Sequence, residues 1–286
     1  MSIIWGCAFG LQSVAATMEW PTVTGTPTIE TSLVRSNGTA GRLGTGETKT
    51  FQQNSYSGGQ GVKFYRVYLH LVTAPASTRA VISVDNGASL KIGIRLTNAR
   101  VLQLFNEEDS AQIGSDSSAI NTGEYYRIEL KVDSTTLAST AVEAGLYAAS
   151  AEGTLLWNPS GTANLAADPN RLSISNRNDA NLVFIVTDIT INDDQGSFVN
   201  TWPGQGSLVY LRPDANSGSP AWTRAGTDSG ANWSQVEETP PNDVTDYVQS
   251  NTNNEVDDYT LGATPGAVGS GDTIKWVAVG ARFALR

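Results

Sequence analysis

Residues 182–214, LVFIVTDITINDDQGSFVNTWPGQGSLVYLRPD, decide the fold that the sequence predicts. The first part, 182–191, is apolar and rich in β-branched side chains, which is typical of a buried strand, and Asp188 is its only charge. A polar turn and a Trp-Pro-Gly corner at 202–204 follow, and a second strand is expected over 208–212, before a Pro-Asp turn. The stretch therefore predicts a buried sandwich strand joined to a second β-rich region by a short acidic hinge.

The residues before this stretch contain many short apolar segments separated by turns. Strands are expected over residues 61–72, 79–87, 90–96, 101–105, 125–132, 141–149 and 172–174. In 90–96 and 125–132 apolar and polar residues alternate, so each strand has one buried and one wet face. Short strands at this spacing, with few helical patterns, indicate an antiparallel β-sandwich. A last strand is expected over 273–286.

The order of residues in and after the hinge resembles bacteriophage virion proteins that carry a concanavalin A-like (LamG-like) jelly roll. The matching residues are Asp188, Ile189, Ile191, Asn192, Asp193, Gly196, Ser197, Asn200, Trp202, Pro203, Gly204, Gly206, Leu211, Arg212, Pro213, Trp222 and Thr223. The strand GEYYRIELKV at 123–132 and the opening at 3–9 also fit, although the acidic residues usual in that opening are missing. The resemblance implies an all-β fold: a concanavalin A-like jelly-roll sandwich over 1–198, then a smaller β-rich domain over 199–286, which a neighbouring subunit could complete.

Composition limits the classes of partner. The 286 residues carry a net charge of −10, with 16% charged and 40% hydrophobic residues. Nucleic-acid binding is not expected, because it needs a basic face. No apolar run reaches the length of a membrane span, and no basic region precedes the short N-terminal apolar patch. Cys7 is the only cysteine, so an internal disulfide is impossible and a buried apolar role is expected for this side chain.

Catalytic groups are scarce in the sequence. His70 is the only histidine, so Ser-His-Asp triads and multi-histidine metal sites lack material, and a structural or solvent-facing role is expected for it. Glu255 and Asp257 supply two acids of a glycosidase-like strand motif, but Tyr259 and Thr260 stand where the third acid belongs. The sequence therefore predicts a protein that is not an enzyme and requires no cofactor.

Three kinds of site remain as candidates. Asp188, Asp193 and Asp194 lie near a strand end, and their hard oxygen atoms suit calcium, although acidic turns are also common without a metal. Aromatic residues in turn-rich contexts are candidates for glycan stacking or for an interface: Trp157, Trp233, Tyr56 and Tyr259. The remaining candidates are expected to pack as an interdomain corner: Trp202, Pro203, Gly204 and Trp222.

The resemblance implies a non-enzymatic structural protein on the outer surface of a tailed bacteriophage virion, either a capsid decoration or a tail appendage. Its expected partners are other virion proteins and copies of itself, for example in a trimer. It would be made in the host cytoplasm and become extracellular after lysis. One alternative is an adhesin that binds a host surface glycan through the jelly roll. Another is a polysaccharide depolymerase, for which the sequence offers no carboxylate pair.

Overall fold

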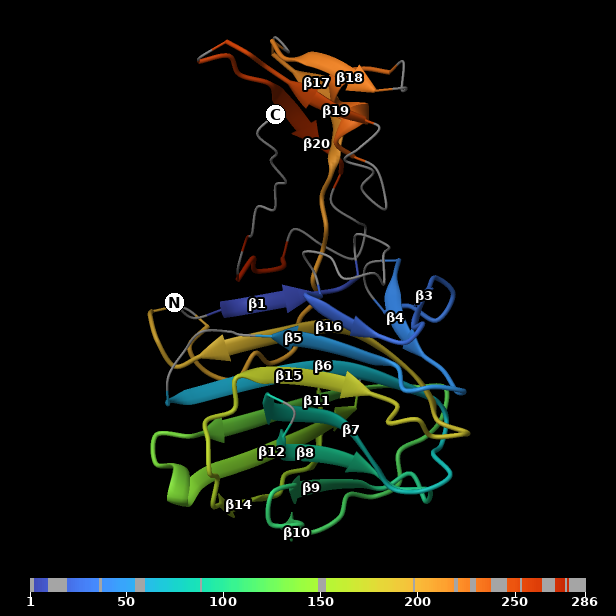
Figure 1. Ribbon diagram of the computed structural model, residues 1–286, viewed down its shortest axis with the longest axis vertical. Helices are drawn as coiled ribbons and strands as arrows, with labels where there is room; N and C mark the ends of the chain where they lie inside the picture. The colour runs from blue at the N-terminus through green and yellow to red at the C-terminus, as the bar shows by residue number, and fades with distance from the viewer. Residues whose placement is uncertain are drawn as a thin grey trace.

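The computed structural model describes the chain in thirteen segments. These are residues 3–9, 20–35, 38–54, 60–87, 89–148, 153–197, 199–218, 221–226, 230–237, 246–252, 254–263, 271–275 and 277. They form an all-β protein, a concanavalin A-like jelly-roll sandwich followed by a smaller β-rich region (Figure 1). Among the described residues no helix is long and apolar enough to cross a membrane; the helical elements there are the short 3-10 turns η1 (Leu137–Ser139) and η2 (Asn232–Gln235).

Two large antiparallel sheets make up the sandwich. The first, called sheet A, runs in the order β13 (Leu155–Trp157), β12 (Thr140–Ala148), β11 (Tyr125–Asp133), β6 (Val62–Thr73), β16 (Val183–Asp193), β4 (Ala40–Leu43) and β3 (Thr28–Glu30), with β1 (Ile3–Cys7) on β16 and β14 (Ser160–Ala163) on β12. The second, called sheet B, runs β10 (Ala111–Ile113), β9 (Leu102–Asn106), β8 (Ser89–Leu96), β7 (Arg79–Asn86), β15 (Arg171–Ser175), β5 (Thr50–Asn54) and β2 (Thr22–Thr24).

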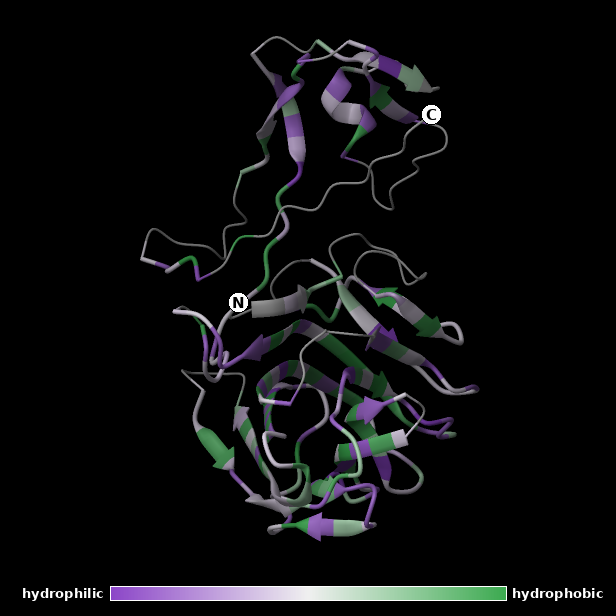
Figure 2. Cartoon of the chain, turned by 60° about the vertical axis from the view of Figure 1, so that its left-hand side comes forward, coloured by the Kyte–Doolittle hydropathy of each residue, from purple (hydrophilic) through white to green (hydrophobic). Residues whose placement is uncertain are grey.

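The hydrophobic core lies between the two sheets. Strand β11 points Tyr126, Ile128, Leu130 and Val132 into it, as the alternating pattern predicts. Figure 2 shows hydrophobic residues along the long strands of the sandwich. Cys7 is fully buried in this core, which confirms its expected role.

The C-terminal region differs from the sandwich in what it buries. Its two small sheets pair β17 (Pro213–Ser217) with β20 (Asp258–Leu261) and β18 (Thr223–Gly226) with β19 (Asp246–Gln249). Within the described part of 213–263, the buried residues are polar, namely Asn232, Gln235 and Asp246. Two-stranded sheets are marginal by themselves, so polar contacts carry much of the order seen there.

Two expected strands do not form. Residues 208–212 are not assigned to a strand, and the strand begins only at Pro213. The reason is that the backbone there bonds elsewhere: the N–H of Leu208 donates to Asp188, and the carbonyl of Arg212 accepts from Gly262. Of the strand expected over 273–286, residues 273–275 and 277 are not in a strand, and the others lie outside the described residues.

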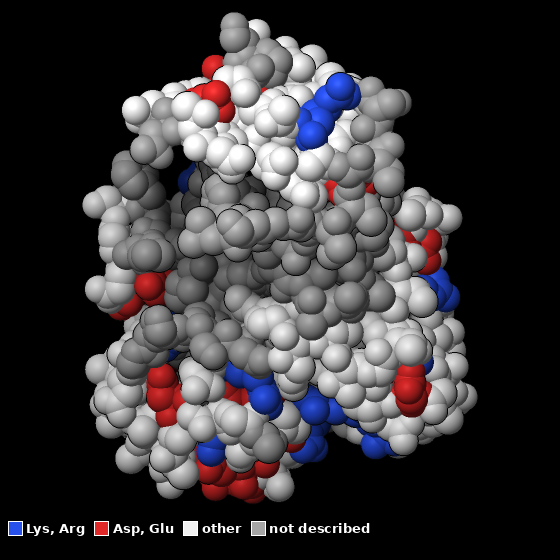
Figure 3. Space-filling view, turned by 45° about the horizontal axis from the view of Figure 1, so that its top comes forward, with Lys and Arg blue, Asp and Glu red and all other residues white. Residues whose placement is uncertain are grey.

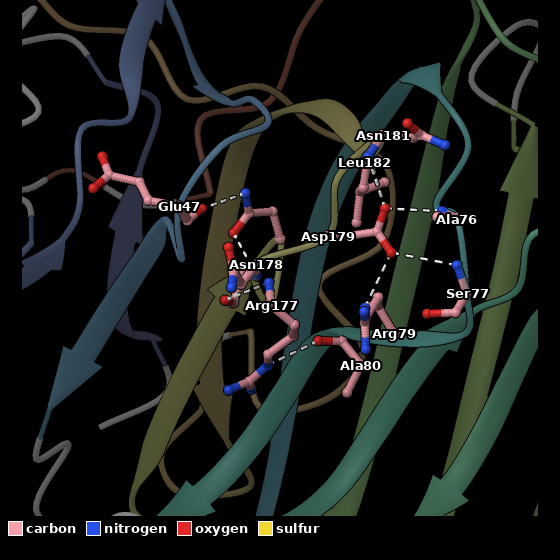
Figure 4. A network of polar contacts seen from close by, with 12 residues as sticks. Glu47, Ala76, Ser77, Arg79, Ala80, Arg177, Asn178, Asp179, Asn181 and Leu182 are labelled. Atoms are coloured by element: carbon pink, nitrogen blue, oxygen red, sulfur yellow. Dashed lines mark hydrogen bonds and ion pairs between the residues drawn. The ribbon is translucent and has the colours of Figure 1, made fainter.

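The turn between β15 and β16 is built on a buried carboxylate, Asp179, which is shown in Figure 4. Its two oxygen atoms accept hydrogen bonds from the side chain of Arg79 and from four backbone N–H groups, those of Ala76, Ser77, Asn181 and Leu182. Burial alone would raise the pKa of Asp179, but these N–H donors outweigh it and hold the pKa at about 2, below the ordinary 3.8. The ionised carboxylate therefore ties the β6–β7 connection to the start of β16.

We expect Asp179→Asn to lower the free energy of unfolding at neutral pH by roughly 2–4 kcal/mol, because charge-assisted hydrogen bonds are lost. A depressed folded pKa gives stability that is present above pH 4 and is lost as the pH falls through about 2. The Asn variant should therefore lack this part of the acid dependence. Denaturant unfolding between pH 2 and 7 measures both effects. The exposed Asp194→Asn serves as control, and equal behaviour of the two variants would contradict the assignment.

Candidate functional site on the outer face of sheet A

The outer face of sheet A carries polar and charged side chains in the middle of the fold. Strand β6 points Tyr65, Val67, Leu69 and Leu71 into the core, so the alternate residues face outward. The strand pairing sets these outward residues in two rows. The first row is Thr187, Tyr68, Arg127 and Tyr147, and the second is Thr190, Arg66 and Glu129. Beside the first row, His70 lies opposite Tyr125.

A β-bulge at Asp188 adjusts β16 to this face. The register of β16 against β6 shifts between Thr187 and Thr190, and Asp188 has a φ of +48°. The extra residue lets apolar side chains on both sides of the bulge, such as Val186 and Ile189, point into the core. Strand β4 pairs before the bulge and β1 pairs after it. Asp188 therefore lies where the neighbour of β16 changes.

The buried Asp188 carboxylate is neutralised and bonded from the outer side. Its Oδ2 lies 2.7 Å from Nη1 of Arg35, and its Oδ1 accepts from the N–H of Leu208 at 2.7 Å. Its backbone carbonyl accepts from Nε of Arg66 at 3.0 Å. One residue thus binds a loop, a strand of the face and the segment that follows the sandwich.

Residues 202–208, here called the strap, lie across this face. The N–H of Gly204 donates to Oε1 of Glu129 at 2.6 Å, and its carbonyl accepts from Nη1 of Arg66 at 3.0 Å. The ring of Trp202 packs edge-on against Phe64, with centroids 5.5 Å apart. The strap therefore contacts the second row mainly through the backbone of a glycine.

Burial perturbs the ionisable groups of the face. It raises the pKa of Glu129, against the opposing effect of Arg127, and it lowers the pKa of Arg66. The side chains of both are nearly inaccessible, at 1% and 4% exposure. Burial also raises the pKa of Tyr125, whose hydroxyl donates to the carbonyl of Leu33 at 2.6 Å. Charges held in such an environment interact strongly with any group placed next to them.

Several buried polar atoms of the face lack a hydrogen-bond partner among the described residues. They are Oη of Tyr68, Nδ1 of His70, Nε of Arg127, Oγ1 of Thr187, Oγ1 of Thr190 and Oδ1 of Asn192. Cationic groups flank them: the guanidinium of Arg35 lies 3.6 Å from the ring centre of Tyr68, and that of Arg127 lies 3.9 Å from the ring centre of Tyr147. Buried polar groups are normally bonded, so this concentration marks the face as the candidate site.

The aspartates predicted to bind calcium are not brought together. Asp188 is paired with Arg35, whereas Asp193 and Asp194 accept hydrogen bonds from Gln195. Within the described residues no group of three or more acidic, histidine or cysteine side chains could hold a metal ion. The calcium site stays a prediction; in the structure the charge of Asp188 is balanced by an arginine.

The predicted aromatic residues are placed apart from one another. Trp157 is buried and donates to the carbonyl of Ser115, so its ring is not open to a glycan. Trp233 and Tyr259 are half-buried in the C-terminal region, where Tyr259 bonds to Asp257. Tyr56 lies outside the described residues.

The residues of the predicted corner also separate. Trp202, Pro203 and Gly204 belong to the strap on sheet A. Trp222 instead donates to the carbonyl of Glu255 within the C-terminal region. Of the candidates named from sequence, the site retains Asp188 and the strap residues; His70, expected to be structural or solvent-facing, is buried there. Arg66, Tyr68, Arg127 and Glu129 were missed; of these, Arg127 and Glu129 lie in a strand whose alternation the sequence showed.

No family model matches the chain, and no curated protein matches it. Among solved structures it is similar to an endo-β-1,4-glucuronan lyase from Trichoderma reesei, with a TM-score of 0.47 and 9% identity over 66% of this chain and 95% of that one. An alginate lyase from Aplysia kurodai is similar with a TM-score of 0.45 and 11% identity, over 67% of this chain and 99% of that one. Domain 4 of an arabinanase from Geobacillus stearothermophilus is similar with a TM-score of 0.42 and 12% identity, over 67% of this chain and 93% of that one.

The comparison contradicts the expected non-enzymatic structural protein of a bacteriophage virion, because polysaccharide lyases are among the solved structures with a similar fold. That expectation, and the expectation that the chain is not an enzyme, are withdrawn. At such low identity the similarity bears on the fold and not on the chemistry. The resemblance to virion proteins stays a prediction.

A comparison of two threonine variants, one in each sheet, tests whether the polar atoms of the face lack hydrogen-bond partners within the protein. We expect Thr187→Val to leave the free energy of unfolding unchanged or slightly higher, because the removed hydroxyl bonds to no described residue. Thr50→Val, on the outer face of sheet B, should cost about 1 kcal/mol, because it breaks the bond to Ser175. Denaturant unfolding measures both. An equal loss in the two variants would show that Thr187 has a partner within the protein.

Proposed function

We propose that the protein is carbohydrate-active, binds an acidic polysaccharide on the outer face of sheet A, and cleaves it by elimination. The observation that carries this proposal is the set of buried polar atoms on Tyr68, His70 and Thr187 that have no hydrogen-bond partner among the described residues. A sugar ring presents hydroxyl groups that donate and accept, so it satisfies phenol, imidazole and threonine groups together.

The charge of the face favours an acidic ligand. Arg35, Arg66 and Arg127 outnumber the two nearby carboxylates, Asp188 and Glu129, although the whole chain carries −10. Guanidinium groups bind carboxylates with two parallel hydrogen bonds, which suits a uronate. In the view of Figure 3, basic and acidic side chains lie among one another on the described part of the visible surface.

The same side chains can support β-elimination from a uronate. Arg127 would pair with the sugar carboxylate and stabilise the negative charge that develops on it. Nδ1 of His70 would accept the proton from the carbon next to that carboxylate, and the hydroxyl of Tyr68 would give a proton to the departing glycosidic oxygen. The carbon–hydrogen and carbon–oxygen bonds break, a carbon–carbon double bond forms, and no water is consumed. His70 and Tyr68 are two residues apart on one face of β6.

A panel of polyuronates and neutral glucans, incubated with the full chain, tests this function through the ultraviolet absorbance of the unsaturated product. We expect product from at least one polyuronate and none from the neutral glucans. Tyr68→Phe and His70→Asn should lower kcat by about a hundredfold or more. Tyr126→Phe is the matched control, because this hydroxyl lies on the opposite side of β11 and bonds to Glu124.

Two results would contradict the proposal. One is the absence of both binding and product with every polyuronate. The other is an equal loss of activity in Tyr68→Phe and Tyr126→Phe, which would point to a general effect on folding. Unfolding curves of each variant separate these causes.

A further inference from the structure

We infer that Arg66 and Glu129 form a sugar subsite that reads two neighbouring ring hydroxyls, and that Gly204 of the strap occupies this subsite in place of the glycan. The inference rests on the proposed function. It adds two residues that recognise the sugar, Arg66 and Glu129, and a segment of the protein that competes with the sugar for them. It is carried by the contacts of one glycine with two nearly inaccessible, oppositely charged side chains.

The bonding pattern of Gly204 matches that of a sugar diol. Its N–H donates to the carboxylate of Glu129, and its carbonyl accepts from the guanidinium of Arg66. Two neighbouring hydroxyls of a pyranose ring can offer the same donor and the same acceptor from adjacent atoms. A carboxylate that only accepts, beside a guanidinium that only donates, is therefore complementary to either partner.

The subsite is continuous with the proposed reaction site. In the ladder between β6 and β11, Arg66 faces Glu129 in the row next to Tyr68 and Arg127. Neighbouring rows on one face are about 7 Å apart along a strand, which is comparable with the length of one sugar ring. A chain held at the first row would thus place its next ring over Arg66 and Glu129, where the strap now lies.

The strap is held in a way that a ligand can replace. Its contacts with the subsite come from backbone groups, and a side-chain atom built at Gly204 would meet nothing within 4 Å. Outside the subsite, Trp202 and Pro203 pack against the protein, Arg35 donates to Gly206 and Ser207, and the N–H of Leu208 donates to Asp188, so Gly204 can leave the subsite while the C-terminal end of the strap stays attached. A ligand that offers the same hydrogen bonds competes directly with Gly204 for the subsite. Because a molecule with a docked strap cannot bind there, the apparent affinity for the ligand falls in proportion to the fraction of molecules whose subsite is open.

Gly204 also provides the variant that opens the face. Its φ is +64°, a conformation that proline cannot adopt, and proline has no N–H to give to Glu129. We expect Gly204→Pro to release the strap and to bind an oligouronate at least about tenfold more tightly than the wild type. Gly46→Pro is the matched control, because Gly46 is an exposed glycine with a φ of +103° in open space outside the strap.

Hydrogen exchange of residues 202–208 and calorimetric titration with an oligouronate are measured on the same full-length samples. In the wild type the oligouronate should speed exchange at Gly204. Adding Glu129→Gln to Gly204→Pro should weaken binding about tenfold, because the amide accepts less strongly than a carboxylate and its NH₂ group opposes Arg66.

The outcomes separate the inference from the function beneath it. Equal affinity of Gly204→Pro and wild type, with exchange showing a released strap, would overturn the competition and leave the function standing. An oligouronate that slows exchange in the strap would overturn it as well. Unchanged affinity on adding Glu129→Gln would remove the subsite. No binding by any sample, with a released strap, would overturn the proposed function and the inference with it.

Discussion

The arrangement depends on the burial of one charge, the carboxylate of Asp188, inside a bulge of β16. A buried carboxylate is costly unless it is paired and bonded, so Arg35 and the N–H of Leu208 must both reach it. These two partners come from the loop between β3 and β4 and from the segment that follows β16. The requirement to compensate one charge therefore fixes where both segments cross sheet A.

The two faces of sheet A have different roles. The inner face joins the core and supplies the stability of the sandwich. The outer face keeps arginine, glutamate, tyrosine and histidine side chains away from water, and several of their polar atoms stay unpartnered among the described residues. Unsatisfied buried polar groups cost stability, which is why we propose a role in ligand recognition for them. The strap covers Arg66 and Glu129 in the second row of this face through backbone contacts of Gly204 that a ligand can replace.

The sequence predicted the fold well where a single period governs a strand. The alternation of residues 125–132 gave β11 and its inner face, because side chains of a strand alternate strictly. The outer cluster was missed because its members come from β6, β11 and β16, and only the register of the sheet brings them together. The bulge was readable in retrospect, since Val186 and Ile189 can share a face only if one residue is inserted. The expected strand over 208–212 does not form because the N–H of Leu208 donates to the buried carboxylate of Asp188 instead of to a neighbouring strand.

The most direct test of this account is backbone hydrogen exchange in Asp188→Asn, with Asp193→Asn as the control for a lost charge near the same strand end. Asn cannot pair with Arg35 as an ion, so the account predicts that Gly204 and Leu208 exchange much faster together, while β6 and β11 keep their protection. A strap that stays as protected as in the wild type would contradict the claim that Asp188 organises this face.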